Sequence, residues 1–404
     1  MIRRGNPSRW YRLAGAAAAL ALVTGACTSG DDDADDDVVI DEPADEPADE
    51  PTDEPTDEPT DEPTDEPTDE PSEAPDDTVD VVQGGSVLDA VMENGAVRCG
   101  TRDALPGFAV LDESGAHVGF DSDFCRVIAA AVLGDAEAVD HVDLETADRF
   151  TALQSGEVDV LVRNTTWTAS RDGAEGATFL QTNYYDGQGM MVNAGDFASI
   201  EEMDGVIVCV AQGTTTEGNA AAEAARLGLD WEVRAFENTD LIQESFIAGQ
   251  CDGWSSDTSQ LTGLRSVYPD GPDALTILPE VFSKEPLAPA VADGDTQWAQ
   301  VVNWAILATI QAEEFGITSE NVDTFADTDN VSIQRFLGLE VEGDEGAAVL
   351  DPGLGLPTDF AYQVVSQVGN YGEIFERHLA PLGLERGLNA LWTDGGLMYA
   401  PPYR

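Results

Sequence analysis

The chain has 404 residues, 42% of them hydrophobic, and a formal net charge of −61 from 18 basic and 79 acidic residues. The hydrophobic fraction is sufficient for a folded core, and the length suits two or three domains. The charge argues against binding to nucleic acid and against electrostatic attachment to anionic lipid, because both need clustered Lys and Arg.

The N-terminus has the pattern of an export signal. Four arginines precede an apolar run over residues 13–23, which is short for a permanent membrane-spanning helix. Small residues at 24–26 then precede Cys27, and this order resembles a bacterial lipobox, in which the cysteine becomes the lipidated first residue. We expect a signal peptide over residues 1–26 and a lipid anchor on Cys27. An ordinary secretory signal with an incidental cysteine is the alternative.

An acidic, repetitive segment follows. Residues 31–80 hold 26 acidic residues and no basic residue, and a unit of Asp-Glu-Pro-Ala or Asp-Glu-Pro-Thr repeats over residues 41–71. Proline at every fourth position is incompatible with a helix, and repulsion between the carboxylates extends the chain. We expect a disordered linker over residues 27–80 that lifts a folded domain off a membrane. A calcium-binding tract is the weaker alternative, because an extended chain does not gather carboxylates around one ion.

From residue 87 onward, β-like runs alternate with helical patterns, which indicates an α/β protein with largely parallel sheets flanked by helices. The first series predicts strand 97–101, helix 121–133, strand 139–144, helix 148–155 and strand 158–162. The second series predicts strand 206–210, helix 216–226, strand 231–236, helix 240–248 and strand 252–255. The repeated order favours two lobes of like topology that face each other across a cleft.

Four cysteines remain besides Cys27: Cys99, Cys125, Cys209 and Cys251. No pair has the C-x-x-C spacing of a zinc or redox site, and an exported protein with well-separated cysteines favours disulfides. Three pairings are possible. We favour Cys99 with Cys125 and Cys209 with Cys251, because each bridge then stays within one half of the molecule.

Several motifs along the chain resemble a known family. A first set is 119–124 (GFDSDF), 153–159 (LQSGEVD), 168–171 (TASR) and 213–217 (GTTTE). A second set is 163–168 (RNTTWT), 185–189 (YDGQG), 283–287 (SKEPL), 367–377 (QVGNYGEIFER), 386–392 (RGLNALW) and 398–403 (MYAPPY). The first set resembles family 3 extracellular solute-binding proteins, and the second is similar to their general L-amino-acid-binding (AapJ-like) branch.

The resemblance implies the type II periplasmic-binding-protein fold. In that fold, lobe 1 would comprise residues 87–193 and 289–404, lobe 2 would comprise residues 194–288, and two crossover strands would form a hinge. Closure of the lobes around a ligand is what the importer of this family senses, and such closure is driven by contacts made only in the closed state.

The resemblance also implies a site for a zwitterionic amino acid. Arg171, three residues after Thr168, would form a bidentate pair with the α-carboxylate, and Asp257 would receive the α-ammonium. Further hydrogen bonds are expected from Asn164, Thr166, Thr214 and Thr215. The last two precede a helix, whose first N–H groups favour an anion. A solvated surface position for Arg171 and a helix-capping role for Asp257 are the alternatives.

The wall around the ligand side chain is expected from four positions. Leu105 stands where related binders place an aromatic ring, and Trp167 would supply aromatic surface unless it packs in the core. Arg102, together with Arg163, would favour acidic or polar side chains unless both form salt bridges.

An enzyme on the same fold, such as a cyclohexadienyl dehydratase, is the rival function, and it would need a positioned acid or base in the cleft. The three histidines, His117, His141 and His378, lie outside the expected cleft motifs and lack metal-site spacing. We therefore expect a monomeric receptor without catalytic residues, cofactor or metal. It would capture L-amino acids, dock on the membrane subunits of an ABC importer, and be held outside the cytoplasmic membrane by lipid on Cys27.

Overall fold

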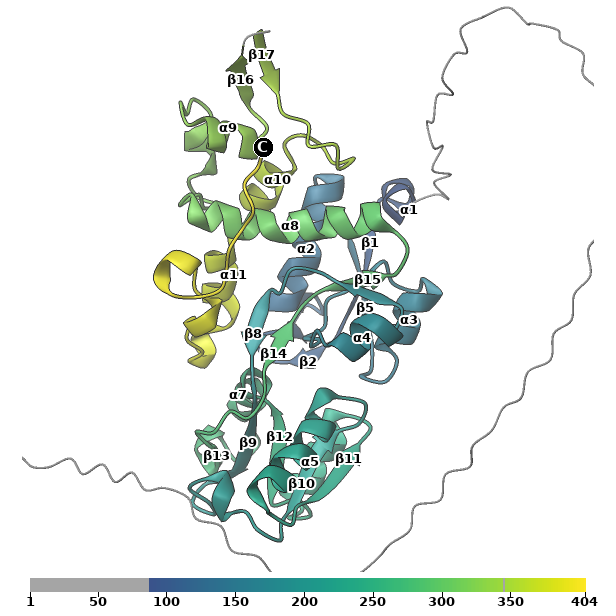
Figure 1. Ribbon diagram of the computed structural model, residues 1–404, viewed down its shortest axis with the longest axis vertical. Coiled ribbons are helices and arrows are strands. Elements are labelled where there is room, and N and C mark those ends of the chain that lie inside the picture. Colours follow the sequence, from purple (N-terminus) through teal and green to yellow (C-terminus); the bar gives the residue numbers. More distant parts are fainter. Residues whose placement is uncertain (1–86, 344–345) are drawn as a thin grey trace, which may run out of the picture. The chain divides into compact units, whose positions relative to one another are not determined.

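The computed structural model describes residues 87–343 and 346–404 (Figure 1). The expected signal peptide, the lipobox at Cys27 and the acidic linker lie outside the described residues. In the two described ranges, no helix is long and apolar enough to cross a membrane.

The first lobe is built on a five-stranded sheet of order β5-β1-β6-β15-β7. The strands are β1 (Val97–Thr101), β5 (Val139–Asp143), β6 (Val160–Leu161), β7 (Ala177–Phe179) and β15 (Ala290–Ala292). β1 runs parallel to β5 and β6, and helices α2 (Phe120–Leu133) and α3 (Arg149–Ser155) make the crossovers that parallel strands require. β15 runs antiparallel to β6 and β7. A small sheet of β2 (Ala104–Leu105), β3 (Ala109–Leu111) and β4 (His117–Val118) follows β1.

The second lobe repeats this arrangement with the order β11-β10-β12-β9-β13. The strands are β9 (Gln188–Asn193), β10 (Ile207–Ala211), β11 (Glu232–Phe236), β12 (Gly253–Asp257) and β13 (Leu275–Ile277). β10 runs parallel to β11 and β12, with crossover helices α5 (Thr215–Leu227) and α6 (Thr239–Ile247). All ten predicted elements are present, with ends shifted by one or two residues. The expected pair of mixed, largely parallel sheets is confirmed.

Two short strands cross between the sheets. β8 (Tyr184–Asp186) carries the chain toward β9, β14 (Glu285–Leu287) carries it back toward β15, and the two pair antiparallel (Figure 1). We propose that this pair is the hinge and that lobe 2 is the segment between its strands, residues 187–284. The sequence placed the boundary after residue 193, but β9 hydrogen-bonds to β12 and β13 and belongs to the second sheet.

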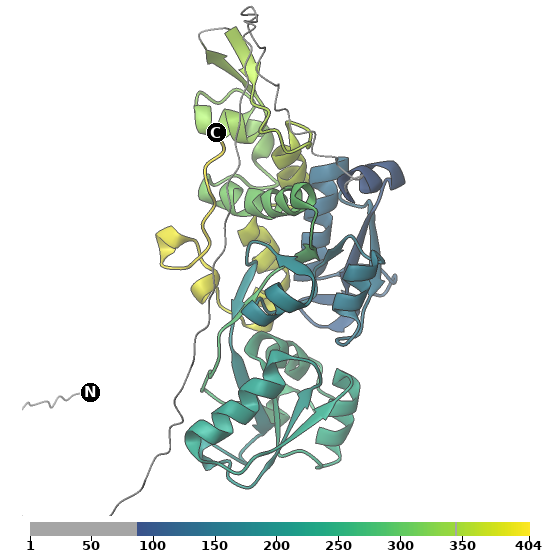
Figure 2. The ribbon, with the colours of Figure 1, turned by 45° about the vertical axis from the view of Figure 1, so that its right-hand side comes forward.

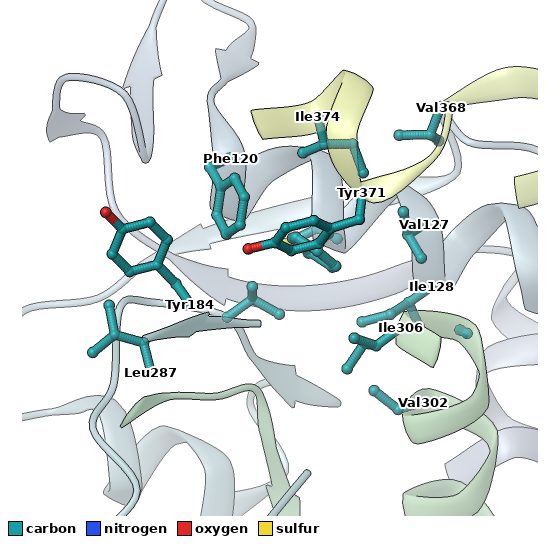
Figure 3. Close-up of a cluster of buried hydrophobic side chains, with 14 of the residues drawn as sticks. Phe120, Val127, Ile128, Tyr184, Leu287, Val302, Ile306, Val368, Tyr371 and Ile374 are labelled. Carbon is teal, nitrogen blue, oxygen red and sulfur yellow. The ribbon is translucent and has the colours of Figure 1, made fainter. Parts of the chain in front are cut away.

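Helices from the C-terminal part of the chain cover the first lobe. α8 (Thr296–Glu314) and α10 (Phe360–Gln367) pack against α2, and α11 (Tyr371–His378) packs against α2 and α8 (Figures 1 and 2). The core between them is aromatic and aliphatic (Figure 3). At its centre Tyr371 contacts Phe120 edge-on and donates its hydroxyl hydrogen bond to the Asn183 carbonyl (2.8 Å), directly before β8. These helices therefore also fix one end of the hinge.

Smaller elements complete the described chain. Helix α1 (Val87–Asn94) opens it, α4 (Ala169–Ala174) precedes β7, and α7 (Thr258–Ser266) follows β12. Beyond α8, α9 (Val331–Phe336) leads into a hairpin of β16 (Glu340–Gly343) and β17 (Gly346–Val349).

Both disulfides have the expected connectivity. Cys99 in β1 is bonded to Cys125 in α2, with a Cα–Cα distance of 6.0 Å. Cys209 in β10 is bonded to Cys251, two residues before β12, with a Cα–Cα distance of 5.8 Å. Each bridge therefore joins two neighbouring elements of one lobe.

Candidate functional site

A narrow polar cavity lies between the lobes, beside the carboxyl ends of β1, β6, β10 and β12. This is where open α/β sheets place ligands, because strand ends and helix starts converge there. The lining residues are Arg102, Thr146, Arg149, Arg163, Asn164, Thr166, Arg171, Ala211, Thr214, Thr215, Thr216, Thr239, Ser256, Asp257 and Gln260. Both lobes contribute to the lining, so the cavity depends on how the lobes close.

The first lobe presents a cationic wall. It consists of Arg102, Arg149, Arg163 and Arg171, which are 8%, 4%, 5% and 8% exposed. Burial lowers the pKa of all four guanidinium groups, and that of Arg163 falls to about 9. Removal from water disfavours the charged form, and the proximity of other arginines adds to this for Arg149 and Arg163. An anion beside this wall would favour the charged form of the guanidinium groups.

Arg171 is held in place by neutral groups. It lies in α4, whose cap Thr168 accepts a hydrogen bond from the Arg171 backbone N–H (3.2 Å). Its Nη1 donates to the Thr166 carbonyl (2.9 Å), and its Cζ lies 5.7 Å from the centre of the Phe150 ring. Arg149 Cζ lies 5.1 Å from the same ring. These contacts orient the guanidinium without neutralising its charge.

The second lobe presents a wall of hydroxyl and N–H groups. Thr214 occupies the N-cap position of α5 without a side-chain capping hydrogen bond, and its hydroxyl donates to the Ala211 carbonyl (2.6 Å). The Thr215 hydroxyl donates to the Glu285 carboxylate of β14 (2.9 Å). Because both hydroxyl protons are already donated within the protein, the backbone N–H groups at the start of α5 are what this segment offers to an anion.

Asp257 supplies the negative charge of this wall. It occupies the N-cap position of α7, but its carboxylate makes no capping hydrogen bond, so the structure does not support the capping alternative. Burial, with Asp186 and Glu285 nearby, raises the pKa of Asp257 well above its usual range, although Arg171 and Arg149 oppose the shift. A cation placed next to this carboxylate would therefore be strongly favoured.

Direct contacts join the two walls. The Asn164 side-chain amide donates to Gln260 Oε1 of α7 (3.1 Å), and Arg149 Nη2 donates to the Gly213 carbonyl (3.3 Å). Gly263 of α7 packs on the first lobe so closely that a Cβ there would lie 2.5 Å from the Pro106 carbonyl oxygen. The lobes are therefore in direct contact beside the cavity.

Asn164 also joins the cavity to a buried acid. Its φ of +32° is a left-handed conformation that asparagine tolerates better than most residues. Its backbone N–H donates to Asp121 Oδ2 (2.9 Å). Burial raises the pKa of Asp121 to about 7, against the hydrogen bond from Asn164 and the charge of Arg102, both of which lower it.

Comparison with known proteins identifies the architecture. The family model for bacterial extracellular solute-binding proteins, family 3, matches residues 97–320. The chain is also 48% identical over 323 residues to the general L-amino acid-binding periplasmic protein AapJ of Rhizobium johnstonii, covering 79% of this chain and 93% of the relative. The chain belongs to the family 3 extracellular solute-binding proteins.

Other relatives of this solute-binding protein agree. The glutamate/glutamine/aspartate/asparagine-binding protein BztA of Rhodobacter capsulatus is 46% identical over 324 residues, which cover 79% of this chain and 94% of the relative. A solved ABC transporter periplasmic binding protein from Brucella ovis, with glutathione bound, superposes with a TM-score of 0.75 at 43% identity, over 79% of this chain and all of the other. A separate model, the PT disordered repeat, matches residues 42–77. AapJ and BztA are amino-acid-binding proteins, and the Brucella ovis protein is a periplasmic binding protein of an ABC transporter.

Eight of the ten residues expected at the site line the cavity of this solute-binding protein: Arg102, Arg163, Asn164, Thr166, Arg171, Thr214, Thr215 and Asp257. The structure does not bring Trp167 and Leu105 to it. Trp167 is 40% exposed, stacks on Phe179 at a ring distance of 6.3 Å and borders a separate surface hollow. Leu105 is fully buried in the core of the first lobe.

Several lining residues were not anticipated from the sequence. They are Thr146, Arg149, Ala211, Thr216, Thr239, Ser256 and Gln260. Arg149 is the most informative of these residues. It is an arginine at the start of α3, yet only 4% of it is exposed. The shortage of basic residues in this chain is the signal that could have drawn attention to it.

Proposed function

We propose that this protein captures L-α-amino acids outside the cytoplasm, by closing its two lobes around them, and delivers them to an ABC importer. One observation carries the proposal: Arg171 and Asp257 line the same buried cavity from opposite lobes. A zwitterion has one charge for each of them. The names of the relatives AapJ and BztA, which are amino-acid-binding proteins, support the same ligand class.

In this proposal each end of the ligand has its own partners. The α-carboxylate pairs with the Arg171 guanidinium and receives N–H groups from the start of α5, which begins at Thr215. The α-ammonium pairs with Asp257, whose pKa is raised by burial and by the nearby Asp186 and Glu285 carboxylates. Asn164 and Thr166 add hydrogen bonds beside Arg171. Because these partners lie on both lobes, the bound ligand favours the closed state.

Isothermal titration of the full chain with each of the twenty L-amino acids, and with prephenate, tests the proposal. We expect saturable binding of at least one amino acid and none of prephenate. Arg171→Ala should weaken binding roughly a hundred-fold or more, because it removes a charged partner from a buried site. An Arg226→Ala control, which removes a surface arginine paired with Glu223, should bind as the parent does. Binding of prephenate alone, or undiminished binding by Arg171→Ala, would contradict the proposal.

We also propose that the protein acts as a monomer tethered through lipid on Cys27, with the acidic segment over residues 27–80 as a spacer. The order of residues 24–27 supports the tether. Cys27→Ala should release the protein from the membrane fraction of expressing cells. Sedimentation of the released protein tests the monomer. Retention of Cys27→Ala in the membrane would overturn the lipid anchor.

A further inference from the structure

Two acidic residues stand opposite each other in the pair of hinge strands. Asp186 ends β8, Glu285 begins β14, and the antiparallel register makes these two residues direct partners. Asp186 is half-buried, and Glu285 is only 1% exposed. Over residues 87–343 and 346–404, neither carboxylate has a basic side chain within the 4 Å of an ion pair. A carboxylate is costly to bury without a cation, so the hydrogen-bond partners of both residues are informative.

Asp186 fastens the start of α7 to β8. Its Oδ1 accepts a hydrogen bond from the Thr258 hydroxyl (2.7 Å), and its Oδ2 accepts from the backbone N–H (3.2 Å) and the hydroxyl of Ser259. The Thr258 backbone N–H donates to the Gly187 carbonyl, directly after β8 (2.9 Å). Asp186 therefore caps α7 in place of Asp257, which occupies the N-cap position without a capping hydrogen bond. The carboxylate of Asp257 is thereby left for a ligand.

Glu285 fastens the start of α5 to β14. Its carboxylate accepts hydrogen bonds from the Thr215 hydroxyl (2.9 Å) and from the Asn219 side-chain amide (2.8 Å), which lie about one helical turn apart. It also accepts from the Ser283 hydroxyl (2.5 Å), shortly before β14. Through Asp186 and Glu285, both helix starts that contribute to the second wall are tied to the hinge strands.

The two hinge carboxylates also act on Asp257 through their charge. Burial raises the pKa of Asp257, and the charges of Asp186 and Glu285 raise it further. Arg171 and Arg149 oppose this shift from the first lobe. In the proposed function Arg171 is engaged by the ligand α-carboxylate, so three carboxylates remain near the ammonium position against Arg149 alone. Such a site favours a cation beyond what one aspartate would achieve.

We propose that Asp186 and Glu285 are specificity-determining residues, which together with Asp257 make a positive charge on the ligand a condition of tight binding. Asp186 caps α7 and so leaves Asp257 for the ligand, and Glu285 holds a further carboxylate beside the start of α5. The inference rests on the proposed function and adds to it two residues outside the lining of the described cavity. They act on the ligand through Asp257 and through their own charge.

Titration calorimetry of the full chain with matched ligands tests this inference. Every one of the twenty L-amino acids that binds is compared with the 2-hydroxy acid of the same side chain, such as L-alanine with L-lactate or L-aspartate with L-malate. In each pair a neutral hydroxyl replaces the α-ammonium. We expect the parent chain to prefer the amino acid roughly a hundred-fold or more, because the hydroxy acid leaves Asp257 without its cation.

The variants Asp186→Asn and Glu285→Gln should each reduce this preference roughly ten-fold. A nearby unit charge changes the binding of a cation in a desolvated site by about that factor. A merely structural role would weaken the binding of both members of a pair equally and leave the preference unchanged, and that result overturns the inference. Urea unfolding shows whether each variant is folded. If Glu285→Gln does not fold, Asp186→Asn decides alone, because Asp186 is only half-buried.

The matched control is Glu223→Gln. It removes a buried carboxylate of the same helix α5 that is ion-paired with Arg226, and it should leave the preference unchanged. An equal loss of preference in the control would also overturn the inference. If no amino acid binds the parent chain, the proposed function itself is refuted. If amino acids bind and the two hinge variants keep the full preference, only the specificity role of Asp186 and Glu285 is refuted.

Discussion

The two walls of the cavity are opposite in character. The first lobe contributes four buried arginines that are held by carbonyl, hydroxyl and aromatic groups. The second lobe contributes threonines, a helix start and one carboxylate, Asp257. Neither wall is electrostatically satisfied alone: the arginines disfavour one another's charge, and burial disfavours that of Asp257. A zwitterion between the walls would complete both lobes at once, so binding and closure would be one event.

The largest expected effect follows from removing the charge of the second wall. Asp257→Asn should weaken amino-acid binding by roughly 3–5 kcal/mol, which is the usual cost of breaking a buried charge pair. The ligand-free protein should become more stable, because Asn needs no charge in a site that raises the pKa of the carboxyl. Titration calorimetry and urea unfolding measure the two effects. If Asp257→Asn is less stable than the parent without ligand, the protein itself stabilises the charged Asp257 carboxylate. The second wall would then need no ligand, contrary to the contrast drawn between the walls.

A second prediction concerns Asp121, the acid behind the cationic wall. Its pKa of about 7 lies above the 3.8 of the free side chain, so protonation favours the folded state. Asp121→Asn, which mimics the protonated form, should therefore be more stable than the parent above pH 7, by at most about 4 kcal/mol. The advantage should shrink as the pH falls through 7 and vanish near pH 4. Urea unfolding of both proteins between pH 4 and 8 measures this difference.

The opposite pH-dependence of stability would contradict this prediction. If Asp121 were held ionised by the arginines, its pKa would be lowered. The Asn variant would then be less stable than the parent at neutral pH, and the deficit would disappear on acidification. That result would make Asp121 a permanent counter-charge to Arg102.

The smallest expected effect tests contact between the walls without touching their charges. Gly263→Ala places a Cβ 2.5 Å from the Pro106 carbonyl oxygen, a distance that requires the lobes to separate slightly. We expect affinity to fall roughly ten-fold, about 1.4 kcal/mol, with little change in the unfolding of the ligand-free protein. Gly218→Ala is a suitable control, because a Cβ at this glycine of α5 meets nothing within 4 Å. If both variants lose the same affinity for the ligand, the contact between Gly263 and Pro106 does not contribute to closure.

Much of the fold could be predicted from local pattern. The alternation of strands and amphipathic helices gave ten elements, because each is encoded within about a dozen residues. Helices α8, α10 and α11 were not predicted, and they pack against α2, which is far away in the sequence. The predicted boundary between the lobes, after residue 193, assigned β9 to the first lobe. The antiparallel pairing of β9 with β12 is a long-range property that local pattern does not show.

Site residues could be predicted where a sequence motif fixes the backbone. They could not be predicted where the direction of the side chain alone determines whether a residue lines the cavity. Arg171 and Asp257 were expected from motifs shared with the family. Asp257 ends β12 and Arg171 lies in α4, and both line the cavity. Trp167 is in the same loop, but its backbone N–H donates to the Pro286 carbonyl (2.8 Å) and its ring turns outward onto Phe179. Arg149 was missed because an arginine in a first helical turn is ordinarily solvent-exposed.

The positions of the two cystines bear on how such a receptor works in an oxidising environment. Each cross-link ties a central strand to an adjoining segment of its own half, and neither spans β8 or β14. Oxidation therefore stiffens each half as a unit while the angle between the halves stays free to change. The covalent framework secures durability outside the cell without restricting the movement on which capture and release depend.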